Sequence, residues 1–71
     1  MDQIILDKIF TYHKPAGNQN DRYDELRRTA HNLAALINFN CPDCHEKSVA
    51  ITKLQEAVMW ANASIAINED S

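Results

Sequence analysis

Two cysteines and a histidine form a stretch of this chain that fits a cofactor-attachment motif. Cys41, Cys44 and His45 match the pattern C-x-x-C-H, in which two thiols add to the vinyl groups of c-type haem and the histidine ligates the iron. A zinc site on the same residues would need a fourth ligand, for which His13 and His31 are candidates without the spacing of a zinc motif. Haem attachment of this kind belongs to exported proteins, and the N-terminal residues lack the pattern of a signal peptide.

The same stretch has a simpler structural interpretation. Pro42 ends one helix, and Asp43 with Glu46 three residues later has the layout of a capping box with the aspartate at the cap position. We therefore expect a turn between two helices at this point, with Cys41 buried and Cys44 incidental. We expect no cofactor and no bound metal.

A second group of residues combines aromatic and basic side chains that could bind a nucleotide. Tyr12 and His13 come just before a break that contains proline and glycine, and a basic stretch follows on the next helix. Tyr12 could stack on a nucleobase, Arg27 or Arg28 could hold a phosphate through two hydrogen bonds, and Thr29 could add a hydroxyl. Alternatively, the aromatic residues pack the N-terminal segment onto the helices and the arginines form a solvated face. On their chemistry alone, the residues favour this alternative.

No arrangement of residues points to catalysis. Asp24 and Glu25 are adjacent, so they point to different faces of a helix and suit its N-terminal dipole. No serine or cysteine has a histidine and an acid at a spacing that suggests a nucleophilic group. We expect a protein that is not an enzyme.

Trp60 and Asn62 lie on the second long helix and have a structural interpretation. We expect Trp60 to pack at a contact between subunits and Asn62 to make a hydrogen bond between helices. Direct contact of either residue with a ligand is the alternative.

Two long helices must position these residues. Apolar residues recur at intervals of three and four over two stretches, which predicts helices at about 19–39 and 43–67, the first capped by Asn18 or Asn20. The two stripes are Tyr23, Leu26, Ala30, Leu33 and Ile37, and Ile51, Leu54, Val58, Ala61 and Ile65. Residues 1–18 form a lead segment with a short helical turn. The short break forces the helices to be antiparallel, so we expect one all-α hairpin domain over residues 1–71.

The composition excludes several classes and favours self-association. One glycine and two prolines in 71 residues argue against a β-meander and a glycine-rich phosphate loop, and no apolar run is long enough to span a membrane. A net charge of −3 disfavours long nucleic acid but leaves room for a small anion held by one or two arginines. The second helix is apolar on more than one face, which one partner helix cannot cover. We therefore expect an obligate homo-oligomer.

Longer stretches of the chain resemble a known family. They are FTYHKP at residues 10–15, RYDELR at 22–27, CP at 41–42 and SVAITKLQEAVMWANA at 48–63. These stretches resemble the phage anti-CBASS cyclic-oligonucleotide sponges of type two, whose small helical-hairpin domain is shared with anti-Thoeris sponges. The resemblance covers about residues 10 to 68, and residues 52–63 are its specific part. The chain departs from the family where Cys44 and His45 follow the proline.

The resemblance implies a fold, a function and a site. It implies a compact helical homohexamer in the cytoplasm of the infected bacterial host, which binds cyclic dinucleotides, and often cyclic trinucleotides at separate sites, without cleaving them. The host effector is thereby deprived of its signal. The family's pocket places a tyrosine against a base and uses a basic residue and a threonine early in the first long helix, which correspond to Tyr12, Arg27 and Thr29. His13 and Arg28 are their neighbours. The alternative function is a protein–protein adaptor with no small ligand.

Overall fold

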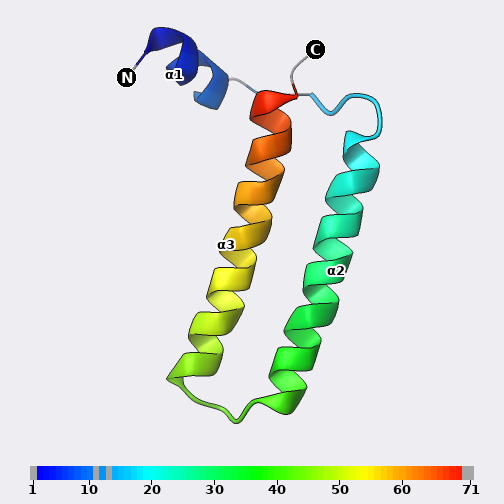
Figure 1. Cartoon of the computed structure of the whole chain (residues 1–71), viewed down its shortest axis with the longest axis vertical. Helices are drawn as coiled ribbons and strands as arrows, with labels where there is room; N and C mark the ends of the chain where they lie inside the picture. Colours follow the sequence, from blue (N-terminus) through cyan, green and yellow to red (C-terminus); the bar gives the residue numbers. More distant parts are fainter. Residues whose placement is uncertain (1, 11, 13, 70–71) are drawn as a thin grey trace.

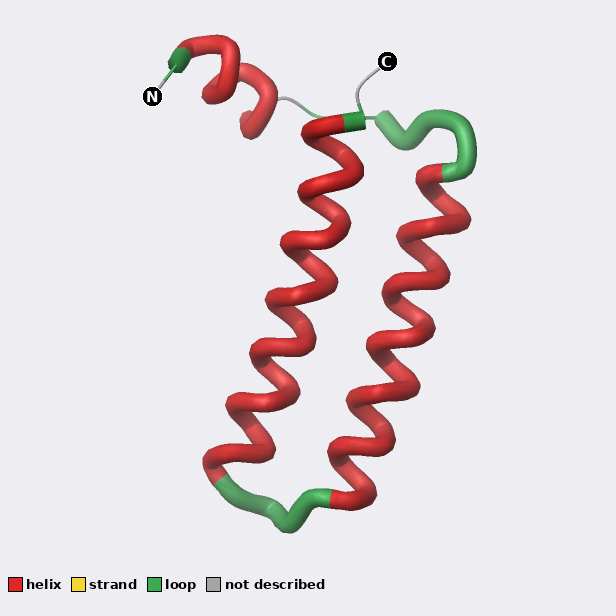
Figure 2. The backbone as a smooth tube through the Cα atoms, in the orientation of Figure 1, coloured by secondary structure: helices red, strands yellow, loops and turns green. Residues whose placement is uncertain are grey.

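All of the regular secondary structure in the described part of the chain is helical. The computed structural model describes residues 2–10, 12 and 14–69, and within them it contains three helices and no strand (Figure 2). They are α1, Gln3–Phe10, α2, Gln19–Asn40, and α3, His45–Asn68. The prediction of an all-α protein is confirmed. None of the described helices is long and apolar enough to cross a lipid bilayer.

The two long helices lie side by side and run in opposite directions (Figure 1). Residues 41–44 connect them at one end of the molecule, and the start of α2 and the end of α3 meet at the other. The short helix α1 lies at this second end and projects away from the pair beside α3. The Asp2 carboxylate begins α1 by accepting a hydrogen bond of 3.0 Å from the Ile4 amide.

Each long helix half-buries one apolar stripe against the other. On α3 the stripe is as expected, since Ile51, Leu54, Val58, Ala61 and Ile65 are all half-buried. On α2 the half-buried apolar residues are Tyr23, Leu26, Ala30, Ala34 and Ile37. Leu33, expected in this stripe, is 46% exposed, and Ala34 takes its place against α3. The small side chains of Ala30 and Ala34, four residues apart, share one face of α2.

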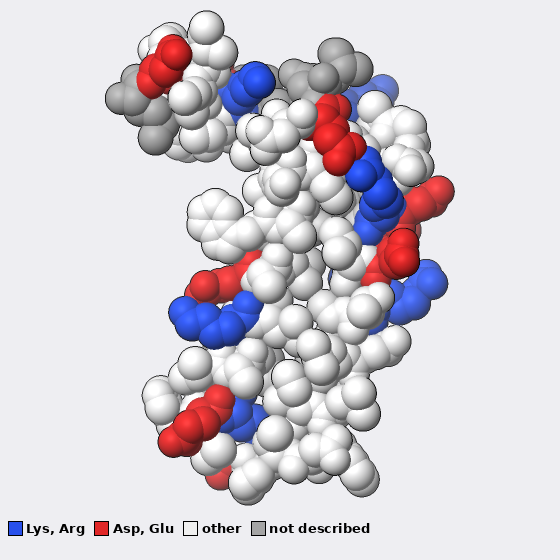
Figure 3. Space-filling model, viewed as in Figure 1, with Lys and Arg blue, Asp and Glu red and all other residues white. Residues whose placement is uncertain are grey.

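No apolar side chain among the described residues is fully buried within one chain. Trp60 on α3 is 74% exposed, and Phe39 at the end of α2 is 88% exposed. Two helices side by side can cover only one stripe of each other, and α3 carries apolar residues on several sides. On the face in Figure 3, charged side chains lie mainly along the sides and leave a broad uncharged surface between them.

The N-terminal ends of the long helices differ from the expected caps. Asn18 is at the N-cap position of α2, but its side chain makes no capping hydrogen bond. The capping-box prediction for α3 is wrong, because Cys44 occupies the N-cap with an extended backbone and Asp43 lies outside the helix. The Asp43 carboxylate instead accepts a hydrogen bond of 2.8 Å from Lys47 Nζ, which lowers the pKa of Asp43.

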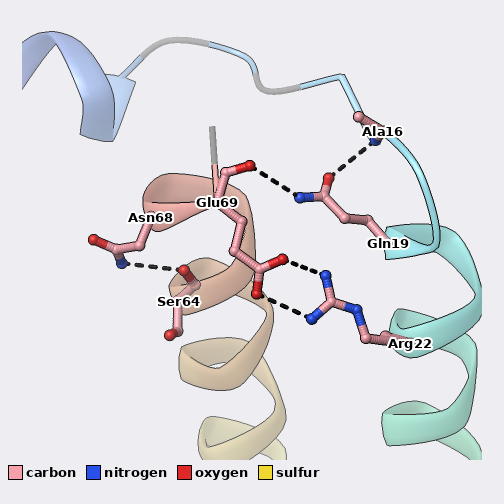
Figure 4. A network of polar contacts seen from close by, with 6 residues as sticks. All are labelled: Ala16, Gln19, Arg22, Ser64, Asn68 and Glu69. Carbon is pink, nitrogen blue, oxygen red and sulfur yellow. Dashed lines mark hydrogen bonds and ion pairs between the residues drawn. The ribbon is translucent and has the colours of Figure 1, made fainter. Parts of the chain in front are cut away.

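A polar network fastens the start of α2 to the end of α3 (Figure 4). The Arg22 guanidinium donates two hydrogen bonds to the Glu69 carboxylate, one of them 3.0 Å from Nη1 to Oε2. Gln19 is buried, accepts a hydrogen bond of 3.0 Å from the Ala16 amide, and donates one of 3.5 Å to the Glu69 carbonyl. These bonds raise the pKa of Arg22 and lower the pKa of Glu69. The network therefore holds the open end of the helix pair together.

Gly17 provides the turn that leads into this network. Its φ of 57° lies in the left-handed region, which costs a residue with a Cβ roughly 1–2 kcal/mol. The turn places the Ala16 amide within hydrogen-bond distance of the side chain of Gln19, the first residue of α2.

Candidate functional site

Two adjoining hollows meet at Arg27 on the surface of the helix pair. The first, called the polar hollow here, has a volume of about 330 Å³ and is lined by Asp24, Arg27, Arg28 and His31. All four residues belong to α2, where spacings of three and four bring side chains onto neighbouring positions of the helix surface. Two arginines and a histidine beside one carboxylate make this hollow a candidate anion site.

The second hollow, called the apolar groove, runs between α2 and α3 and has a volume of about 320 Å³. Arg27 and His31 line it as well, so these two side chains are shared by both hollows. The rest of its lining is largely apolar and comes from both helices: Ala30, Ala34, Ile51, Leu54, Gln55, Val58 and Met59. An apolar floor with a few polar groups at the rim is the usual make-up of a small-molecule site.

The cations of the polar hollow differ in their partners. Arg27 Nη1 lies 3.3 Å from Asp24 Oδ1, and the side chains are 69% and 58% exposed. Arg28 has no ion pair with any of the described residues. An exposed pair of this kind contributes little to stability, so Arg27 can change partner at small cost.

Thr29 lies in a different hollow from Arg27. It lines a space of about 460 Å³ with Arg22, Glu25, Leu26 and Ile65. Residues two apart on an α-helix do not face each other, which explains the separation. Within one chain, therefore, the structure places Arg27 and Arg28 together and leaves Thr29 apart from them.

Tyr12 lies between α1 and α2 and is 82% exposed. Phe10, at the end of α1, is equally open, so neither ring packs the N-terminal segment onto the long helices of the same chain. His13, the neighbour in the expected site, lies outside the described residues. The tyrosine ring is available for contact with a ligand or with another chain.

The cysteine-containing stretch forms an exposed loop. Cys41, expected to be buried, is exposed, and both Cys41 and Cys44 are free thiols. In the described part of the chain, no three His, Cys, Asp or Glu side chains are grouped closely enough to hold a metal ion.

Asn62 does not make the expected hydrogen bond between helices through its side-chain oxygen. Oδ1 is buried and has no hydrogen-bond partner among the described residues. The neighbouring Trp60 is mostly exposed, as a residue that contacts another subunit would be in a single chain.

Two residues of the apolar groove were missed by sequence reasoning. His31 was considered only as a zinc ligand, although its position four residues after Arg27 was a signal that both share one face of α2. Gln55 comes from α3, and no sequence spacing shows which residue of α3 lies opposite Arg27.

Comparison with known families gives a match over nearly the whole chain. The family model described as Acb2/Tad1, hairpin domain, matches residues 2–66. That range includes α1, α2 and most of α3, together with all of the candidate ligand-binding residues. No curated protein and no solved structure matches the chain.

Proposed function

Because the chain belongs to the Acb2/Tad1 hairpin-domain family, we propose that it is a non-enzymatic sponge for cyclic dinucleotide second messengers. It binds and sequesters the messenger in the cytoplasm of the infected bacterium, so that the effector of the host CBASS defence stays inactive. The family match over residues 2–66 is the observation that carries this proposal. Cyclic trinucleotides are a second ligand class that the family resemblance implies.

The chemistry of the polar hollow supports an anionic ligand. Arg27 and Arg28 present two guanidinium groups beside His31, and a guanidinium can hold a phosphate through two parallel hydrogen bonds. A cyclic dinucleotide carries two phosphates in one small ring. Its charge is therefore concentrated enough for a protein with a net charge of −3 to bind it through a few arginines.

We also propose that the chain forms a homohexamer and that more than one of its chains completes the site. Arg27 and Thr29 line separate hollows of one chain, so a ligand that contacts both residues would bridge two chains. The open ring of Tyr12 is likewise free to reach a ligand held by a neighbouring chain. Self-association would also cover the apolar surface that one chain leaves exposed.

Calorimetry against cyclic GMP–AMP, cyclic di-AMP, cyclic di-GMP and a cyclic triadenylate tests the proposal. We expect nanomolar dissociation constants for at least one cyclic dinucleotide, about −12 kcal/mol of binding free energy. Heat denaturation of the complex should release the ligand chemically intact. Linear products that accumulate with time would contradict the non-enzymatic part, and absence of binding to the whole panel would contradict the function.

The exposed apolar surface favours one alternative function, a protein–protein adaptor without a small ligand. Trp60 and Phe39 are large, exposed aromatic side chains of the kind enriched at protein interfaces. The ratio of absorbance at 260 and 280 nm of the freshly purified protein separates the two functions. A bound nucleotide raises this ratio, and the increase is lost when the protein is denatured and dialysed. An adaptor without a ligand shows the ratio of the protein alone.

A further inference from the structure

The polar hollow and the apolar groove share a boundary formed by two side chains. Arg27 and His31 line both spaces, with Asp24 and Arg28 on one side and the floor between α2 and α3 on the other. A nucleotide has the same division, because an anionic phosphate lies next to a planar, largely apolar base. We propose, on the basis of the proposed function, that His31 and Gln55 contact the ligand, with one phosphate of a cyclic dinucleotide in the polar hollow and the adjoining base on the apolar groove.

The charges in the two spaces match this orientation and not the reverse. Both guanidinium groups are in the polar hollow or at its boundary, while α3 contributes no charged residue to the groove. The groove floor of Ala30, Ala34 and Leu54 offers flat, apolar contact without a hydrogen-bonding group in its side chains. A phosphate placed there would lose its hydration without gaining a partner, whereas a base would not.

Besides Arg27, two polar side chains line the groove, and their expected contacts differ. His31 lies beside Arg27 in the polar hollow, where its ring can form a hydrogen bond with the phosphate. Gln55 reaches the groove from the opposite helix, and its amide both donates and accepts. His31 is therefore a contact to the part that all cyclic dinucleotides share, and Gln55 is a contact that depends on the base.

The experiment measures binding of cyclic GMP–AMP, cyclic di-AMP and cyclic di-GMP to His31→Ala and Gln55→Ala by calorimetry. His45→Ala is the matched control, because His45 is also exposed but lies at the start of α3 by the loop end. We expect His31→Ala to weaken binding of every ligand that the parent binds by fivefold or more. We expect Gln55→Ala to change the ratio of affinities between ligands of different base by threefold or more, and His45→Ala to stay within twofold of the parent.

Light scattering on the same variants decides between a ligand and another chain as the occupant of the groove. An unchanged mass for His31→Ala and Gln55→Ala, with the binding changes above, supports the proposal. A smaller assembly shows that a second copy fills the groove, which overturns it. If the parent binds and both variants bind as tightly as the parent, this inference is overturned but the proposed function stands. A parent that binds no cyclic nucleotide refutes the proposed function and this inference together.

Discussion

At the residue scale, Arg27 pairs with Asp24, and the phosphate of the proposed ligand would compete with this carboxylate. Within the chain its guanidinium pairs with the exposed Asp24 carboxylate at 3.3 Å. Such a pair contributes about 0.2–1 kcal/mol, whereas a hydrogen bond from a guanidinium to a phosphate contributes about 1.5–3 kcal/mol. A phosphate in the polar hollow would therefore displace Asp24 from Arg27, and the negative charge of Asp24 would oppose its binding.

Replacement of Asp24 by asparagine should strengthen ligand binding. Asp24→Asn removes the competing pair and one negative charge from the polar hollow, so the dissociation constant for a cyclic dinucleotide should fall by about two- to fivefold. Glu25→Gln is the matched control, because Glu25 is the next residue but lines the hollow of Thr29. Equal gains for both variants in calorimetry would show a general effect of net charge rather than release of Arg27.

Loss of Arg27 or Tyr12 should weaken binding for different reasons. We expect Arg27→Ala and Tyr12→Ala each to raise the dissociation constant at least tenfold, since a phosphate contact contributes about 1.5–3 kcal/mol and base stacking about 1–3 kcal/mol. Only Arg27→Ala should flatten the dependence of affinity on salt, because salt screens the phosphate contact. Calorimetry at two salt concentrations measures both effects.

Lys53→Ala is the control for these variants, since Lys53 is an exposed cation of α3 outside both hollows. Parent-like binding by both variants would mean that the site lies elsewhere. Loss of the assembly in both would mean that Tyr12 and Arg27 are structural.

The sequence predicts which residue types a candidate site would use more readily than it predicts their arrangement. Arg27 and Arg28 lie three and four residues after Asp24, so helical spacing brings both arginines beside the same carboxylate. Thr29 and Arg27 are two residues apart, so helical spacing places them on different faces of α2. The position of α3 then decides which hollow each face lines. His31 and Gln55 could not be paired from the sequence, because their proximity depends on the register between two helices.

At the scale of elements, the spacing of apolar residues predicts the bounds of the two long helices to within a few residues. It does not predict how the ends of these helices are capped. Helix α3 was expected to begin at about residue 43 and begins at His45, which removes Asp43 from the cap and leaves it to pair with Lys47. The contact of Arg22 with Glu69 joins residues 47 apart in the sequence, so no local pattern predicts it. Such a contact exists only because the helix lengths bring these two ends to the same level.

The Arg22–Glu69 contact should make stability sensitive to acid. Arg22 holds the pKa of Glu69 below its ordinary value of 4.5, so the charged carboxylate is favoured in the folded state. The contribution of the charged Glu69 to the free energy of unfolding is fully present above its pKa in the unfolded state. This contribution is lost as the pH falls through the lower pKa of the folded state. We expect Glu69→Gln to lower the thermal midpoint at pH 7, and the difference from the parent to shrink as pH falls below about 4.5.

Glu56→Gln is the control for this titration, because Glu56 pairs with Lys53 at 3.7 Å within α3 and joins no second element. Circular dichroism melts from pH 7 to pH 3 give both midpoints. A difference for Glu69→Gln that stays constant over this range, or that Glu56→Gln reproduces, would contradict the role of the network in holding the helix ends together.

At the scale of the whole molecule, the surface of one chain predicts an assembly. Light scattering on a sizing column should give a mass several times that of the 8.1 kDa chain. A folded species of 8.1 kDa at micromolar concentration would contradict self-association.

Trp60 offers a direct test of which surface associates. Its ring is 74% exposed in one chain, so Trp60→Ser should change little in an isolated chain. At an interface, loss of a tryptophan anchor typically costs about 2 kcal/mol or more, which is roughly thirtyfold in an association constant. We expect the variant to dissociate at higher concentration than the parent in a dilution series. Lys53→Ser, an exposed change on the same helix, should leave the dissociation midpoint unchanged.

Because no apolar side chain among the described residues is buried within one chain, we expect folding to depend on protein concentration. Ordering a chain has a large entropic cost that apolar burial must offset, and two helices that share one half-buried stripe offset only part of it. When the remainder comes from contacts between copies, the thermal midpoint rises with protein concentration, and dilution acts as a denaturant. In a cell, such a protein would become resistant to proteases only after enough copies had been synthesised to meet one another.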